Sequence, residues 1–132
     1  MQNYRFTLPF EVRDYECDLE GIVNNAIYQH YLEHARHVFL KQQHIDFADL
    51  VRRGINLVIV RVEIDYLHSL RSGDTFVVGL NLERISRLRF AFLQDIFLLP
   101  AQTPVVRAKV IGTALNERGR PFVAEELERL VA

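Results

Sequence analysis

Residues 17–37 read CDLEGIVNNAIYQHYLEHARH, and the pattern of the sequence changes in the middle of this stretch. The part up to Asn24 is rich in Asp, Glu and Gly and has no regular spacing of apolar residues, which indicates a loop. From Ile27 onward, apolar residues recur at steps of three and four, as they do on one face of an α-helix. A short polar side chain at Asn24 or Asn25 can cap the first turn. We therefore expect a helix that begins there and ends near Gln43.

The segments on both sides of this helix carry the patterns of β-strands. Apolar and polar residues alternate over residues 4–12, which predicts a strand with one buried face. A short second helix, DFADLVRRG (46–54), precedes a region that reads almost entirely as long strands. The four strands expected there are INLVIVRVEIDYLHSL (55–70), TFVVGLNLERIS (75–86), RLRFAFLQDIFLL (87–99) and VVRAKVIGTALN (105–116). The predicted architecture is an α+β domain in which one dominant helix packs on a curved antiparallel sheet of five strands.

The composition suits a single folded domain spanning residues 1–132. Hydrophobic residues make up 49% and charged residues 25%, which is enough to bury a core. The net charge is −1 and the basic residues are spread along the chain, so we expect no binding to nucleic acid or to a membrane surface. The N-terminal segment lacks the pattern of a secretion signal. The single cysteine, Cys17, is typical of a reducing compartment, so we expect a cytoplasmic protein.

The predicted architecture leaves part of the sheet without cover. One amphipathic helix covers only one face, and no other long element remains for the exposed sheet edge and the open face. The helix also has apolar residues over much of its circumference. We therefore expect at least a homodimer.

A row of histidines on the predicted helix resembles a zinc site. His30, Glu33 and His34 fit the H-x-x-E-H pattern, and His37 extends the row by one turn. Such a site needs a further ligand from another element and a larger domain to hold a peptide, and the chain offers neither. We therefore expect no metal and interpret the row as a polar stripe that faces solvent or a partner.

The chain has few candidates for a nucleophile. Cys17 would need a nearby cation to lower its pKa, but its neighbours Glu16 and Asp18 are acidic. No serine lies in a G-x-S-x-G elbow, and no glycine-rich phosphate loop is present in the sequence. Cys17 is therefore interpreted as a small, partly buried side chain.

Asp18 has a more distinctive position, because it lies in the loop directly before the only long helix and three residues ahead of Gly21. A glycine can take a positive φ and let the chain turn closely past a ligand. The helix N-terminus supplies unpaired N–H groups and the positive end of the dipole. A carboxylate beside such donors has the parts needed to attack an ester or thioester. Alternatively, Asp18 only caps a turn or favours the helix dipole.

The stretch VRDYECDLEGIVNNAIYQHYLEHAR (12–36) resembles the signature of the hotdog-fold thioesterases of the 4-hydroxybenzoyl-CoA thioesterase and YbgC type. Together with SLRSGDTFVV (69–78) and an Arg-Pro pair near the end, it looks closer still to plant-type acyl-ACP thioesterases of the acyl-lipid and methylketone-synthase kind. The resemblance extends from Val12 to about Pro121. It implies a hotdog fold, and homodimers that often pair as dimers of dimers, with active sites between subunits.

The resemblance also implies roles for single residues. Asp18 matches the catalytic aspartate, and Gly21 matches the glycine of the pattern. Asn25 matches the helix-start residue whose backbone N–H polarises the thioester carbonyl. Glu33 lies where many relatives have an acidic residue, and we interpret it as a helix-face or interface group. No cofactor is expected.

The substrate that the resemblance implies is acyl-CoA or acyl-ACP, from which a fatty or β-keto fatty acid would be released. The acyl group is expected between the helix and the sheet, beside Tyr28, Tyr31, Leu32, Phe90 and Phe92. Arginines near the subunit boundary would contact the pantetheine arm or the phosphates, and the candidates are Arg87, Arg89, Arg118 and Arg120. Two alternatives remain open: a non-catalytic acyl-CoA-binding protein of the same fold, and a hotdog dehydratase or hydratase.

Overall fold

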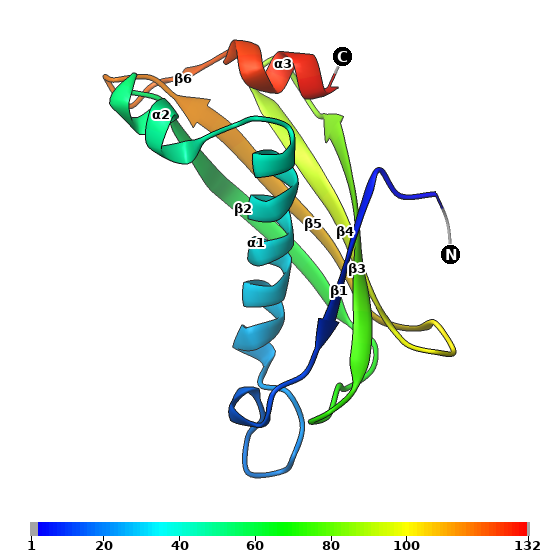
Figure 1. The fold of residues 1–132 in the computed structure, drawn as a ribbon. Coiled ribbons are helices and arrows are strands. Elements are labelled where there is room, and N and C mark those ends of the chain that lie inside the picture. The colour runs from blue at the N-terminus through cyan, green and yellow to red at the C-terminus, as the bar shows by residue number, and fades with distance from the viewer. Residues whose placement is uncertain (1–2, 132) are drawn as a thin grey trace.

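The computed structural model describes residues 3–131 and contains one long helix that packs against one face of a curved antiparallel sheet (Figure 1). The strands are β1 (Phe6–Glu11), β2 (Asn56–Tyr66), β3 (Thr75–Arg84), β4 (Arg89–Leu98), β5 (Thr103–Leu115) and β6 (Pro121–Phe122). The helices are α1 (Asn25–Gln42), α2 (Phe47–Arg52) and α3 (Glu125–Val131), and a 3-10 turn covers Asp14–Glu16. This α+β architecture is the hotdog fold that the resemblance implies.

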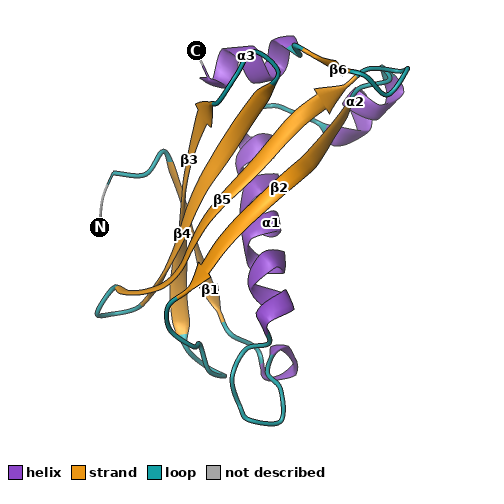
Figure 2. Ribbon diagram, turned by 180° about the vertical axis from the view of Figure 1, so that it is seen from behind, coloured by secondary structure: helices purple, strands orange, loops and turns teal. Residues whose placement is uncertain are grey.

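The strand order in the sheet is β1-β3-β4-β5-β2, with β6 beside the end of β5. All neighbouring strands are antiparallel, and the curved sheet lies across α1 (Figure 2). β2 is therefore an edge strand that pairs only with β5 within the described chain. The register of this pair shifts between Ile59 and Arg61, and a bulge of this kind increases the local twist.

The beginning of α1 agrees with the sequence prediction. Asn24 is the N-cap residue, and its Oδ1 accepts a hydrogen bond from the N–H of Ala26 at 2.9 Å. The helix ends at Gln42, one residue before the predicted end. None of the helices in residues 3–131 combines the length and apolar character needed to cross a membrane.

The strand predictions are confirmed for five strands but incomplete at the C-terminal end. The predicted strand 55–70 ends at Tyr66, because the N–H groups of Leu67 and His68 both donate to the carbonyl of Val105 and the regular pairing with β5 stops there. The sixth strand, β6, has only two residues, which is too short to show an alternating pattern. The helix α3 was not predicted either, although it buries Leu127 and Leu130.

The core lies between α1 and the face of the sheet that α1 covers. Leu32, Ala35 and Phe39 of α1 are almost completely buried. They belong to one cluster with sheet residues that include Phe76, Val78, Leu80, Phe92, Ile96, Val106 and Val110. The Tyr31 and Phe76 rings are also in contact, with centroids 4.7 Å apart. The helical spacing of apolar residues thus forms the face that attaches α1 to the sheet.

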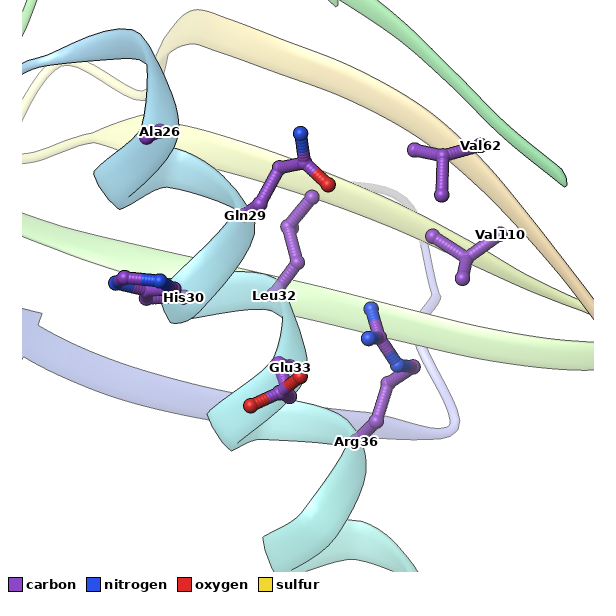
Figure 3. Close-up of a pocket in the computed structure, with 8 residues that line it drawn as sticks. All are labelled: Ala26, Gln29, His30, Leu32, Glu33, Arg36, Val62 and Val110. Carbon is purple, nitrogen blue, oxygen red and sulfur yellow. The ribbon is translucent and has the colours of Figure 1, made fainter. Parts of the chain in front are cut away.

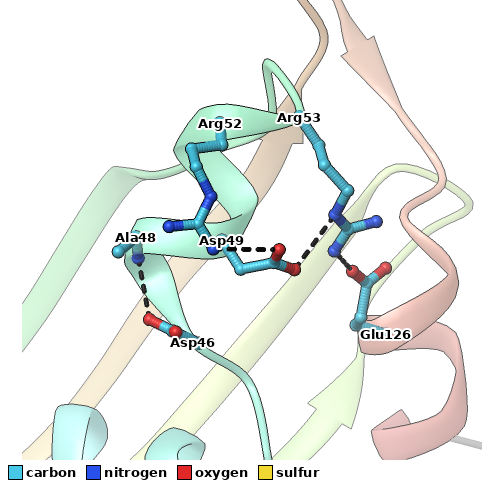
Figure 4. Close-up of polar contacts among 6 residues, drawn as sticks. All are labelled: Asp46, Ala48, Asp49, Arg52, Arg53 and Glu126. Carbon is cyan, nitrogen blue, oxygen red and sulfur yellow. Dashed lines mark hydrogen bonds and ion pairs between the residues drawn. The ribbon is translucent and has the colours of Figure 1, made fainter.

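The two short helices close one end of the sheet. Asp46 caps α2, because its Oδ1 accepts a hydrogen bond from the N–H of Ala48 at 2.9 Å (Figure 4). Arg53 forms an ion pair with Asp49 of α2 at 3.1 Å and a second one with Glu126 of α3 (Figure 4). These contacts join α2 to α3 at the end opposite to the loop that precedes α1 (Figure 1).

We predict that Phe39→Ala lowers the free energy of unfolding by about 3–5 kcal/mol, because it leaves a cavity under α1. The control is Val51→Ala on α2, where the side chain is exposed and the expected change is below about 0.5 kcal/mol. Urea unfolding followed by circular dichroism measures both values. Similar losses in the two variants would contradict the assignment of Phe39 to the core.

Candidate active site

The loop between β1 and α1 folds back on itself before the helix begins. Cys17 and Val23 form an antiparallel bridge, and the N–H of Asp18 donates to the carbonyl of Ile22 at 2.9 Å. Gly21 has a φ of +78°, as expected from the sequence, and its N–H donates to the carbonyl of Asp18 at 3.0 Å. Glycine suits this turn because the left-handed conformation costs it no steric clash.

Two tyrosines of α1 hold this loop and the turn that precedes β3. The hydroxyl of Tyr31 donates to Oε1 of Glu16 at 2.8 Å, and that oxygen also accepts from the N–H of Arg13. The hydroxyl of Tyr28 accepts a hydrogen bond from the N–H of Leu70 at 2.9 Å. Burial and the hydrogen bond to Glu16 raise the pKa of Tyr31, so its hydroxyl remains a donor. Both contacts fasten the surroundings of Asp18 to the first turns of α1.

Asp18 itself is exposed at the tip of this loop. Its Oδ1 accepts a hydrogen bond from the N–H of Glu20 at 2.8 Å, which is the geometry of an Asx turn. Within residues 3–131 its other carboxylate oxygen forms no hydrogen bond, and Asp18 does not line the cavities described below. The carboxylate is thus available to a ligand or to another subunit.

The N–H of Asn25 is an unused donor at the start of α1. Asn24 binds the next two N–H groups of the helix: its side chain accepts a hydrogen bond from the N–H of Ala26, and its carbonyl accepts one from the N–H of Ile27. The N–H of Asn24 donates to the carbonyl of Glu16 at 3.2 Å. No hydrogen bond within the described chain uses the N–H of Asn25. A main-chain donor of this kind can stabilise an oxyanion.

The candidate arginines lie at the other end of the sheet. Arg87 is in the turn between β3 and β4, and Arg89 is the first residue of β4. Arg118 and Arg120 are in the turn that follows β5. The ten residues of β3 separate these turns from the Asp18 loop, a distance of about 33 Å along an extended strand. One chain therefore does not bring these arginines together with Asp18.

The predicted histidine stripe is exposed on α1. His34 packs edge-on against Phe10, and His37 packs edge-on against Phe47 of α2. Glu33 is exposed on the same helix. Within residues 3–131, no three His, Cys, Asp or Glu side chains are grouped so that they could hold a metal ion.

Two adjoining cavities form a groove between α1 and the β2 side of the sheet. The first, of about 330 Å³, begins at Ala26 in the first turn of α1 (Figure 3). The second, of about 150 Å³, lies farther along the helix and is mainly apolar, with Leu40, Phe47, Leu57, Val58, Ile59, Phe90 and Phe92 in its wall. Glu33 and Arg36 line both cavities. Of the five residues expected beside an acyl chain, Leu32, Phe90 and Phe92 line this groove, whereas Tyr28 and Tyr31 do not.

The Tyr31–Glu16 contact yields a stability prediction. Tyr31→Phe removes a donor from a buried carboxylate, and we expect a loss of about 1–3 kcal/mol in the free energy of unfolding. Tyr15→Phe is the control, because its hydroxyl is bound only at the exposed surface and we expect a change within about 0.5 kcal/mol. Chemical denaturation measures both. An unchanged stability of Tyr31→Phe would show that the contact does not anchor the loop.

The sequence of the chain is similar to a known family and to known proteins. Residues 12–127 match the sequence model of the Thioesterase-like superfamily. Two chloroplastic acyl-acyl carrier protein thioesterases of Arabidopsis thaliana, ATL3 and ATL2, are 42% and 41% identical to the chain over 111 and 114 residues. These matches cover 84% and 86% of this chain but 58% and 61% of those proteins, so the chain spans only part of their length.

The fold has a similar counterpart among solved structures. The structure of Slr0204, a 1,4-dihydroxy-2-naphthoyl-CoA thioesterase from Synechocystis, has a TM-score of 0.88 and covers 96% of this chain and 94% of its own. The sequence identity is 20%, so this similarity supports the fold alone. Because the family match extends from the end of β1 to α3, the chain belongs to the Thioesterase-like superfamily, with its hotdog fold.

Proposed function

We propose that the protein hydrolyses acyl thioesters, with Asp18 as the base or nucleophile and the N–H of Asn25 as the oxyanion donor. The observation that carries the proposal is the unused N–H of Asn25 at the start of α1, next to the loop that exposes the Asp18 carboxylate. Membership of the superfamily supports the same chemistry. Gly21 contributes through the turn that shapes this loop.

The proposed reaction converts an acyl thioester and water into a free acid and a thiol. Asp18 either attacks the carbonyl carbon to form a mixed anhydride or removes a proton from the attacking water. Both routes need an ionised carboxylate. The N–H of Asn25 and the helix dipole stabilise the oxyanion, and a donor of this type is worth about 3–4 kcal/mol in other enzymes. The departing thiolate needs little help from an acid, so one carboxylate is sufficient.

The substrate class that we propose is a fatty or β-keto fatty acyl group carried by CoA or ACP. The two Arabidopsis relatives are named as acyl-ACP thioesterases. The groove along α1 begins beside the proposed oxyanion donor and has an apolar far end, which suits an acyl chain. The single cysteine supports a reducing, cytoplasmic location.

A second subunit is part of the proposed site. The outer edge of β2 is unpaired within the described chain, and Ile59, Val60 and Val62 are more than one third exposed on this strand. The strand also exposes charged side chains such as Arg61 and Glu63, but an unpaired edge of eleven residues is normally covered in a stable protein. We propose that two β2 strands pair antiparallel about a two-fold axis, and that such dimers associate further into dimers of dimers.

This pairing also gives a role to the distant arginines. The start of β2 lies beside the end of β5, close to the turn that carries Arg118 and Arg120. The end of β2 lies near the start of α1, where the Tyr66 hydroxyl approaches the carbonyl of Asn25 at 3.5 Å. Antiparallel pairing therefore brings the turn of one subunit toward the helix start of the other, where its arginines would contact the phosphates of the carrier. Arg89 lies farther from this edge, because β5 separates β4 from β2, and Arg87 lies in the turn that leads into β4.

We predict that Asp18→Asn lowers kcat by at least about a hundredfold, because the charge of the base or nucleophile is lost. The asparagine oxygen can still accept the N–H of Glu20, so the turn is preserved. Glu20→Gln in the same exposed turn is the control and should retain activity. Thiol release from acyl-CoA and acyl-ACP measures both. Unchanged hydrolysis by Asp18→Asn would refute the role of Asp18, and acyl-CoA binding by the wild type without thiol release would identify a non-catalytic binding protein.

The dimer proposal predicts that Val60→Lys dissociates the protein, because a lysine in the middle of an edge strand opposes strand pairing. Sedimentation analysis should give at least twice the chain mass for the wild type, namely twice for the dimer or four times for the dimer of dimers. The variant should sediment as a single chain, with a parallel loss of thioester hydrolysis. Val51→Lys, at an exposed position of α2, should keep the mass of the wild type. A wild type that sediments as one chain would contradict the proposed interface.

A further inference from the structure

Arg36 is a buried cation without an anionic partner. Only 9% of its surface is exposed, on the face of α1 that meets the sheet. Its Nη1 donates to Oε1 of Gln94 at 3.0 Å, and the fully buried amide of Gln94 donates in turn to the carbonyl of Leu32 at 2.9 Å. The guanidinium also lies over the ring of Phe92, 6.0 Å from its centre. Within residues 3–131 no carboxylate forms an ion pair with Arg36, so its closest polar partner is a neutral amide.

This arrangement is unfavourable for the protein alone. Removing an unpaired charge from water costs several kcal/mol, and burial accordingly lowers the pKa of Arg36, with a smaller opposite influence from Glu33. A guanidinium carries several N–H donors, of which Gln94 takes one. No fully buried side-chain nitrogen or oxygen in the described residues lacks a partner, so the remaining donors of Arg36 reach the surface of the groove. These donors are available to a ligand.

The close-up of the groove shows where such a ligand would lie. Arg36 points toward Val110 and the β2 side, whereas Glu33, which also lines both cavities, points in another direction (Figure 3). Arg36 lines both cavities, at the point where the wider one gives way to the mainly apolar one. A methionine or leucine at this position would suit a plain hydrocarbon chain better, because it would avoid the cost of the buried charge.

The position of Arg36 along α1 defines the length of chain that reaches it. Asn25 and Arg36 are eleven residues apart in one helix, which is an axial separation of about 16 Å. Long side chains in a helix lean back toward its N-terminus, which shortens the distance to the guanidinium. If this lean takes about one helical turn, roughly 5 Å, off the separation, about 11 Å remain. A fully extended chain advances about 1.2 Å per bond, so an acyl chain that starts at the N–H of Asn25 would meet Arg36 after roughly eight to ten carbons.

We propose that Arg36 binds an acceptor oxygen, on a hydroxyl, carbonyl or carboxylate group, near the far end of a medium-length acyl chain. The protein would then hydrolyse acyl thioesters oxygenated well beyond the β carbon in preference to plain ones of the same length. This inference rests on the proposed thioester hydrolysis and refines its substrate class.

The test compares four CoA thioesters: decanoyl, ω-hydroxydecanoyl, decanedioyl and hexanoyl, of which the last is too short to reach Arg36. For the wild type we expect kcat/KM to be at least about tenfold higher for one or both oxygenated chains than for decanoyl-CoA. A charge-assisted hydrogen bond from Arg36 to the added oxygen would give a difference of this size. The Arg36→Met variant should lose this preference and keep hexanoyl-CoA hydrolysis. Lys41→Met, which removes an exposed cation of the same helix, should keep the preference.

Equal kcat/KM values for decanoyl-CoA and both oxygenated thioesters in the wild type would overturn the inference, whether or not the variants fold. An unchanged preference in Arg36→Met would overturn it as well. If Arg36→Met does not fold, the double variant Arg36→Met/Gln94→Leu takes its place in the test. It removes both partners of the buried hydrogen bond together, so neither is left unpaired.

The failure of the proposed function has a different signature, namely that the wild type hydrolyses none of the four thioesters. In that case calorimetry with the free acids still decides the role of Arg36. Decanedioic acid should bind the wild type at least about tenfold more tightly than decanoic acid, and Arg36→Met should remove the difference. Equal binding of the two acids to the wild type would overturn the inference.

Discussion

The candidate site depends on two tyrosine hydroxyls in the first turns of α1. Tyr31 donates to the buried carboxylate of Glu16, and Tyr28 accepts the N–H of Leu70. A buried carboxylate is stable only while it has donors, so the loop that contains Glu16 cannot leave the helix without a cost. Asp18 follows Glu16 by two residues, and its position relative to the start of α1 is therefore set by these contacts.

The molecule separates the parts of the proposed chemistry along α1. The unused N–H of Asn25 lies at the beginning of the helix, and the carboxylate of Asp18 lies in the loop that precedes it; in our proposal, charge develops between them during hydrolysis. Arg36 lies farther along the same helix, between two cavities of the groove, where it would distinguish one acyl chain from another. The open edge of β2 is the place where, in our proposal, a partner subunit would pair and bring its distant turns toward the helix start.

Patterns among neighbouring residues predict the backbone structure around this site well. Helical spacing, the cap at Asn24 and the turn at Gly21 depend on neighbouring residues, and the structure has all three. The burial of Arg36 depends on which sheet residues meet α1, although its spacing from Leu32 and Phe39 on the buried face is a signal that can be read from the sequence. The separation of Arg89 from Asp18 depends on the length of β3 and on the pairing of Ile22 with Arg71 just before β3, and no local pattern reveals that pairing. The short strand β6 exists only through its pairing with β5.

A crystal structure of the Asp18→Asn variant with an unhydrolysed acyl-CoA would test the proposed site most directly. We predict that the thioester carbonyl oxygen lies about 3 Å from the backbone nitrogen of Asn25. The amide at position 18 should lie beside the carbonyl carbon, and the acyl chain should follow the groove toward Arg36. A thioester bound elsewhere, with the N–H of Asn25 still unused, would contradict the account.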